Sequence, residues 1–288
     1  MLTMLVPSKL VADFKGTASL PVIYFKLNEA INDPNTSIHK ISNVISEDAS
    51  LSARLLKLVN SPFYGFPQKI GTISEAVFLV GSQQVRDVAL ATTMMKTFTG
   101  IPGDLMDMEK FWMHSLACGV GAKVLAVTIG EPEFERFFVA GVLHDIGRLV
   151  MYSKASEESK VILQRSLQER RPMVDIEYEE IGCSHAEIGR ALLDAWKLPQ
   201  YYQEVAAFHH SPERAQQYPL ETAVVHVADT IVHSLQFGTS GELYVPRMQK
   251  DCWHKLNLSL NQLSKLMHVI EHEVNLILKM FQIQEVAA

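Results

Sequence analysis

The sequence has little of what marks secreted, membrane-spanning or disulfide-stabilised proteins. Only three cysteines occur among 288 residues, Cys118, Cys183 and Cys252, and this odd, scattered set predicts reduced thiols and no disulfide framework. Apolar residues make up 48% of the chain, yet they never run unbroken for the roughly 18 positions that a membrane helix needs. The start lacks the basic segment, long apolar stretch and cleavage site of a signal peptide. We therefore expect a soluble, cytoplasmic protein with no membrane partner.

Basic residues are also scarce in any concentrated form. The net charge is −6, and the only basic cluster of note, around Arg165, Arg170 and Arg171, lies in a stretch that also carries Glu157 and Glu169. Nucleic-acid-binding proteins usually show a basic stripe or a high isoelectric point. The cluster is therefore interpreted as a solvated helix face, and nucleic acid is not favoured as a partner.

The apolar pattern predicts an all-α, multi-helical fold. Apolar residues recur at three- and four-residue spacing almost everywhere, and no convincing stretch alternates apolar and polar residues between hairpin turns. Prolines and glycines predict a structured loop over residues 60–74, and Thr36 or Ser37 is a candidate helix cap. The expected helices cover residues 20–33, 37–48, 49–60, 81–98, 107–129, 133–153, 155–170, 184–197, 200–210, 219–237 and 258–283.

Gly100, Pro102 and Gly103 form the clearest break in this pattern, and we place a lobe boundary there. The chain is thus predicted to have an N-terminal helical lobe over residues 1–103 and a helical core over residues 104–238. A C-terminal helical extension would cover residues 239–288. Its long helix is expected to pack back onto the body, with a homodimer seam as the alternative.

Seven residues of metal-ligand type lie beside the apolar stripes of five predicted helices. His114 shares a face with apolar and small residues and should point inward, although a lone histidine there would be an ordinary core residue. Asp145 lies in a very apolar stretch next to His144, and a carboxylate buried there without a partner would be costly. A metal cation is one partner for it, and Arg148 is the structural alternative. Gly141 and Gly147 leave room beside the pair.

Three more histidines lie at predicted helix ends. Ser184 and Glu187 have the spacing of a capping box, which places His185 in the first turn of a helix. His209 and His210 end the next helix, where they could instead cap its C-terminus and interact with the helix dipole.

The seventh candidate, Asp229, is again a carboxylate within an apolar helix, on one face with His226 and His233. These two histidines are outer partners or plain surface residues. Mixed imidazole and carboxylate donors suit Fe, Mn, Zn or Ni, and the set is large enough for one or two ions. The candidate ligands of this divalent transition metal are His114, His144, Asp145, His185, His209, His210 and Asp229.

The order of these residues resembles the HD superfamily, whose signature of a histidine, an adjacent His-Asp pair and a distal aspartate would be His114, His144 with Asp145, and Asp229. His185 and the His209–His210 pair resemble the expanded set of HD-GYP domains and their relatives, the HDOD domains. The HDOD likeness is the closer one, because residues 46–65 and 69–90 resemble the N-terminal half of that family. Residues 185–199 and 208–213 resemble its C-terminal half, and the likeness spans roughly residues 14–235.

This resemblance implies a bacterial signal-transduction output module. Ser-Pro-Glu-Arg follows His210 where HD-GYP enzymes have a Gly-Tyr-Pro motif, and Arg148 stands where they usually have lysine. Both departures weaken the interpretation as a cyclic-di-GMP phosphodiesterase. HDOD domains are often joined to receiver or other regulatory domains, for which the residues before about 14 are too few. A stand-alone protein or a separately expressed output half is implied.

Three hypotheses follow. In the first, the chain is a signalling module that engages a protein or nucleotide ligand. In the second, it is a metal-dependent phosphohydrolase or phosphodiesterase acting on a nucleotide or cyclic dinucleotide, with Asp145 and metal-bound water as its catalytic groups. In the third, the histidines bind nothing. Elemental analysis of the purified protein separates the third hypothesis from the others.

Overall fold

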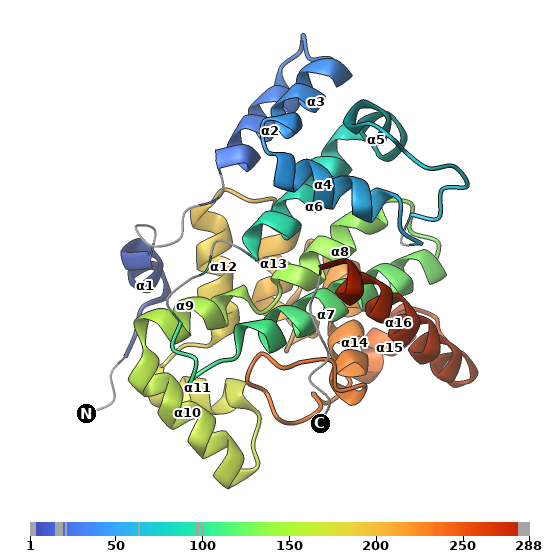
Figure 1. The fold of residues 1–288 in the computed structure, drawn as a ribbon. Coiled ribbons are helices and arrows are strands. Elements are labelled where there is room, and N and C mark those ends of the chain that lie inside the picture. Colours follow the sequence, from blue (N-terminus) through green and yellow to red (C-terminus); the bar gives the residue numbers. More distant parts are fainter. Residues whose placement is uncertain are drawn as a thin grey trace. The chain divides into compact units, whose positions relative to one another are not determined.

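The regular structure of this protein is helical. The computed structural model describes residues 4–14, 20, 22–62, 64–95, 98 and 101–281, and these residues contain helices and no strand. The prediction of an all-α fold is therefore confirmed (Figure 1). Residue 21 of the predicted helix 20–33, residues 96–97 of the helix 81–98, and residues 282–283 of the last helix lie outside the described residues.

The helices pack into two compact units that are interleaved in sequence. The first comprises residues 1–19 and 98–271, and the second comprises residues 20–97 and 272–288. The predicted three-part domain division remains a prediction, because these units describe packing and not independent folding.

The second unit contains five short helices near the start of the chain. Ser37 caps α3 by accepting a hydrogen bond from the Lys40 backbone, as one of the two expected caps. Thr72 and Glu75 form a reciprocal capping box on α5, a helix that the sequence pattern did not predict. The helices are α2 (Val22–Asn32), α3 (Ile38–Ser46), α4 (Ala49–Val59), α5 (Ile73–Val80) and α6 (Ser82–Met94).

The first unit carries the long central helix α7 and the helices around it. Its members are α1 (Pro7–Phe14), α7 (Met108–Thr128), α8 (Phe134–Leu143), α9 (Ile146–Lys154), α10 (Ser156–Glu169), α11 (Met173–Ile181), α12 (His185–Ala195), α13 (Gln200–Phe208), the 3-10 helix η1 (Pro212–Arg214), α14 (Pro219–Ser234) and α15 (Lys250–Lys255). The last helix, α16 (Leu260–Phe281), begins in this unit and ends in the second.

Helix α7 forms the centre of the first unit. Asp107 caps its start by accepting hydrogen bonds from the backbone N–H groups of Glu109 and Lys110. By length and composition alone it is the one helix of the described chain that could cross a membrane, yet 89% of its most apolar window is buried inside the fold. Its apolar character is that of a core helix, which packs mainly against α8 and α14.

The predicted single helix over residues 133–153 is wrong at its middle. Helix α8 ends at Leu143, and α9 begins at Ile146 after Asp145 adopts a non-helical backbone conformation with ψ of 11°. The two halves diverge because they serve different neighbours: α8 packs on α7, and α9 packs on α12. His144 and Asp145 therefore lie at a helix junction and not on one continuous helix.

Candidate metal centre

Five segments of the first unit bring all seven predicted ligands together. His114 comes from α7, and His144 and Asp145 come from the α8–α9 junction. His185 comes from α12, His209 and His210 directly follow α13, and Asp229 comes from α14. Six of the seven side chains belong to residues that are at most 2% exposed, and His210 alone is partly exposed. They form two groups, and within each group the donor atoms lie within 4.8 Å of one another. The first donor group comprises Asp145, His185, His209 and His210, and the second comprises His114, His144 and Asp229.

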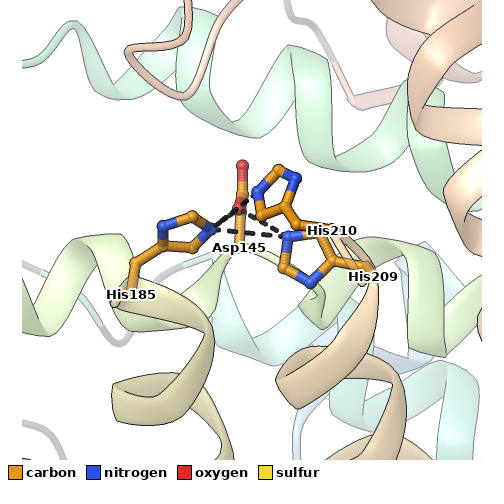
Figure 2. Close-up of side chains that lie close together, drawn as sticks. All are labelled: Asp145, His185, His209 and His210. Atoms are coloured by element: carbon orange, nitrogen blue, oxygen red, sulfur yellow. Dashed lines mark hydrogen bonds and ion pairs between the residues drawn. The ribbon is translucent and has the colours of Figure 1, made fainter. Parts of the chain in front are cut away.

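In the first donor group, three imidazoles surround the Asp145 carboxylate (Figure 2). The Asp145 Oδ1 atom lies 3.0 Å from Nε2 of His185 and 3.4 Å from Nε2 of His209. Nε2 of His210 is 3.1 Å from Nε2 of His185. Three ring nitrogens and a carboxylate oxygen thus face one small volume, an arrangement that favours a cation shared among them.

The second donor group is centred on Asp229. Its Oδ1 atom lies 3.2 Å from Nε2 of His114 and 3.6 Å from Nε2 of His144. The predicted neighbour His233 lies on the same helix and approaches the same oxygen with Nδ1 at 2.9 Å. His233 is therefore an outer partner of Asp229, which was one of the two interpretations of it.

Asp145 lies between the two groups. Its Oδ1 atom faces His185 and His209, whereas its Oδ2 atom lies 3.4 Å from Nε2 of His144 in the second group. A carboxylate that offers one oxygen to each group can be shared by two ions, as in two-metal sites.

Hydrogen bonds on the outer side of the rings set their orientation. Nδ1 of His144 lies 2.6 Å from the Gly141 carbonyl oxygen, and Nδ1 of His209 lies 2.9 Å from that of Ala206. Both carbonyls can only accept, so each Nδ1 carries a proton and each Nε2 points inward. Metal-binding histidines are oriented in this way by their outer partners.

Glu177 on α11 orients His185 and was missed by the sequence interpretation. The carboxylate is fully buried and accepts hydrogen bonds from the His185 backbone N–H at 2.8 Å and from Nδ1 at 2.6 Å. A signal was present, because Glu177 shares the helical stripe of Met173 and Ile181. The stripe was overlooked since no helix was predicted over residues 173–181.

Arg148 ties Glu177 to the first donor group. Its side chain is fully buried, with one terminal nitrogen 3.1 Å from Glu177 and Nε 3.3 Å from Asp145 Oδ2. The expected structural partner of Asp145 is therefore present beside the histidines, and Arg148 does not replace them. The guanidinium faces two carboxylates, Asp145 and Glu177, and Asp229 is a third buried carboxylate of the site. With neutral imidazoles, Arg148 balances only one of these three charges and leaves two negative charges.

Two glycine contacts bring the ligand-bearing segments close. A Cβ added at Gly141 would lie 2.7 Å from the Cα of Gly119, so α8 crosses α7 in close contact. A Cβ added at Gly147 would lie 2.0 Å from the His185 carbonyl oxygen, so α9 is also in close contact with α12. The room predicted beside His144 and Asp145 is thus filled by neighbouring helices, which carry further ligands.

Burial sets the protonation of several ligands. It lowers the pKa of His114 to about 4 and holds the pKa of His210 well below the usual value, so both rings are neutral near pH 7. Burial alone would raise the pKa of Asp145, but the neighbouring charges, the Arg148 guanidinium first among them, hold it well below its usual value. For His144 and His185 burial would lower the pKa, but neighbouring acidic groups outweigh it and raise the pKa. Because metals bind neutral rings and ionised carboxylates, metal binding at these two rings would release protons.

The donor set fits a metal ion by a second criterion, its unpartnered atoms. Among the described residues, Nε2 of His114 and His144 and Oδ1 of Asp145 and Asp229 are buried and lie close to other ionisable groups, yet they form no hydrogen bond. Buried polar atoms are nearly always paired, and each exception calls for an explanation such as an ion. All four atoms belong to the two donor groups, and a cation would satisfy them.

His226 has a structural role. Its Nδ1 lies 2.8 Å from the His209 carbonyl oxygen, and its Nε2 accepts a hydrogen bond from the Gln249 backbone N–H at 2.9 Å. Both ring nitrogens are occupied, so His226 supports the segment that carries His209 and is not available as a ligand.

Comparison with known proteins gives the family context. An HDOD domain model matches residues 18–212. An uncharacterized protein of Treponema pallidum (strain Nichols) is 28% identical over 233 residues, which are 79% of this chain and 44% of that protein. The chain therefore spans less than half the length of this curated relative.

Solved structures share the fold. An HDOD domain protein of unknown function from Geobacter sulfurreducens superposes with a TM-score of 0.71 at 24% identity and covers 95% of both chains. A Shewanella amazonensis protein, provisionally assigned as a phosphohydrolase, gives a TM-score of 0.72 at 22% identity, covering 94% of this chain and 97% of its own. At these identities the likeness shows a shared helical architecture and nothing beyond it.

Proposed function

We propose that this chain, which belongs to the HDOD domain family, is a bacterial signal-transduction output module built around a buried metal centre. The module would act in the cytoplasm and engage a protein or nucleotide ligand at its surface. One or two divalent transition-metal ions, of Fe, Mn, Zn or Ni, would be held by the two donor groups, with Asp145 shared between them.

The observation that carries this proposal is the enclosure of a complete donor set. Donor atoms from five segments converge in the interior, and only His210 is partly exposed. A metal held there joins α7, α9, α12, α13 and α14, so its binding free energy contributes to folding. Enclosure favours a centre that stabilises or switches the module over one that turns over a bulky substrate.

Arg148 supports the same conclusion. In a phosphohydrolase, a cationic side chain after the His-Asp pair could bind a substrate phosphate. Here the guanidinium is fully buried and lies against Asp145 and Glu177. It is thus engaged within the protein and is not directed toward solvent.

The test combines metal content with a cleavage screen. We expect protein grown with supplemented Fe, Mn, Zn and Ni to retain about one or two ions per chain through dialysis, as tightly held sites do. The same preparation should not cleave a panel of nucleotides and cyclic dinucleotides efficiently. Efficient turnover by the metal-loaded protein would contradict the signalling role, and a metal-free preparation would contradict the metal centre.

A metal-dependent phosphohydrolase acting on a nucleotide or cyclic dinucleotide is the second candidate, and the position of Asp145 favours it. This residue offers one oxygen to each donor group, and two ions held by these groups would supply Lewis-acid chemistry toward phosphoesters. In such an enzyme Asp145 would hold the metals, and Asp145→Ala should abolish turnover. Unchanged turnover in this variant would contradict the phosphohydrolase role.

A further inference from the structure

A polar cavity lies on the first unit, outside the two donor groups. It has a volume of about 400 Å³, within the range of small-molecule sites. Its lining residues come from helices α12 and α13, from η1 and from the segment that follows η1. Its lining residues are Arg190, Gln200, Gln203, Glu204, Phe208, Arg214, Gln216 and Gln217.

The cavity presents positive charge on a chain that is negative overall. Among the described residues, the guanidinium groups of Arg190 and Arg214 form no hydrogen bond or ion pair with a protein group. The single acidic lining residue, Glu204, uses its carboxylate to accept backbone N–H groups of Gln216, Gln217 and Tyr218 at 2.5–3.1 Å. Two available guanidiniums and one engaged carboxylate favour an anionic ligand, and guanidinium groups suit phosphate in particular.

A flat surface and several amides accompany this charge. The Arg214 guanidinium lies over the Phe208 ring, 5.1 Å from its centroid, and such a plane can stack a nucleobase. Four glutamines line the walls, each with an amide able to donate and accept. The Gln203 amide nitrogen donates to the Leu198 carbonyl at 2.9 Å. The Gln203 side-chain oxygen is then the group that could accept a hydrogen bond from a ligand. A nucleotide offers a matching phosphate, a planar base and a hydrogen-bonding base edge.

A second cavity, in the other unit, lacks this character. Its two lysines are already paired, Lys26 with Glu47 and Lys40 with Asp33. The α12–α13–η1 cavity is therefore the stronger candidate for an anionic ligand.

We propose that the α12–α13–η1 cavity binds a mononucleotide. Arg190 contacts the phosphate, Arg214 on Phe208 stacks the base, and the glutamines contact its edge. The inference rests on the proposed function and deepens it, because it names the ligand class and its site. Phe208 directly precedes His209 and His210, so the nucleotide would bind beside the segment that carries two ligands of the first donor group.

The experiment is isothermal titration calorimetry on the full, metal-loaded chain. The probes are ATP and GTP, AMP and GMP, adenosine and guanosine, and inorganic phosphate. We expect at least one nucleotide to bind and its nucleoside to bind about tenfold more weakly or worse, because the charged hydrogen bonds to phosphate are lost. Arg190→Gln and Arg214→Gln should each weaken nucleotide binding by about tenfold.

Arg247→Gln is the matched control. Arg247 is exposed and does not line the cavity, so this variant should bind as the parent does. Equal loss in all three variants would mean a diffuse charge effect and would overturn the proposal. So would nucleotide binding that survives both cavity substitutions, binding of phosphate as tight as that of nucleotide, or no binding of any nucleotide.

Metal content measured on the same samples separates this proposal from the proposed function. A protein that holds its ions but binds no nucleotide contradicts the cavity assignment alone. A protein that holds no ions but binds nucleotide in an Arg190-dependent way contradicts the metal centre alone. Circular dichroism of each variant identifies any loss of binding that comes from unfolding.

Discussion

The two donor groups are alike in chemistry but differ in how firmly the fold holds them. In the first donor group, a buried carboxylate fixes His185 and a backbone carbonyl fixes His209. In the second, a carbonyl fixes His144, but Nδ1 of His114 has no hydrogen-bond partner among the described residues. Outer partners orient ligand rings and strengthen metal binding. The difference therefore predicts a tighter ion in the first group than in the second.

The number of donors points the same way. The first group offers four ligand atoms and the second offers three, so an ion in the second group depends more on the shared Asp145 and on water. We therefore expect the two groups to bind metal ions with different affinities, which variants can separate.

Asp145→Asn should have the largest effect, because it weakens both groups at once. We expect metal content to fall from one or two ions per chain to near zero, since Asn keeps the shape but removes the charge facing both groups. The metal-free protein should also lose about 3 kcal/mol of stability, because Arg148 loses one of its two buried partners. Asp229→Asn is the matched control and should remove the second-group ion only. Equal losses in the two variants would contradict the bridging position of Asp145.

His185→Ala and His114→Ala should each lower the affinity of one ion. We expect His185→Ala to abolish the tighter phase of a chelator-competition titration and His114→Ala to abolish the weaker one. Each loss should exceed the roughly 10- to 100-fold that removal of an outer partner costs. Loss of the tighter phase in His114→Ala would contradict the expectation that the first donor group holds the tighter ion.

Much of this site could be predicted from the sequence. Each predicted ligand is an ionisable residue in an otherwise apolar helix pattern, and all seven lie in the two donor groups. The capping box of Ser184 and Glu187 also placed His185 correctly at a helix start. These features depend on local spacing, which a sequence displays directly.

What could not be predicted depends on tertiary packing or on short helices. The break at Asp145 arises because α8 and α9 pack on different neighbours, and a continuous apolar pattern gives no sign of it. Helix α5 was missed because its short apolar run, with exposed Phe78 and Leu79, has little helical periodicity. Because no helix was predicted at α11, Glu177 was not recognised as a functional residue. Its role follows only from its contact with the His185 ring.

Glu177→Gln should have an intermediate effect, confined to the first donor group. We expect a 10- to 100-fold loss of affinity for the tighter ion, because Gln can no longer accept from His185 as a charged group. Chelator competition measures this loss, and the affinity of the weaker ion should not change. Glu179→Gln is the control on the same helix, since its exposed carboxylate pairs with Arg165 and Arg171 only. It should leave both affinities unchanged, and a loss there would mean that α11 acts through general stability.

Two glycine substitutions should have the smallest effect on metal affinity, and each should act on one donor group only. A Cβ at Gly189 would lie 3.3 Å from the Gly147 nitrogen, where α12 meets α9 beside the first donor group. A Cβ at Gly121 would lie 3.3 Å from the Ala228 Cβ, where α7 meets α14 beside the second. Both contacts are tight but not blocked, so the helices need to separate by only a few tenths of an ångström.

Each alanine should therefore shift one group and leave the other in place. Unfolding stability should change by less than about 1 kcal/mol, because the packing cost is offset by the better helix propensity of alanine over glycine. We expect Gly189→Ala to weaken the tighter ion a few-fold and Gly121→Ala to weaken the weaker one, as read by chelator competition. If both variants weakened both ions equally, the two groups would move as one rigid centre, and the difference in how the fold holds them would have no energetic consequence.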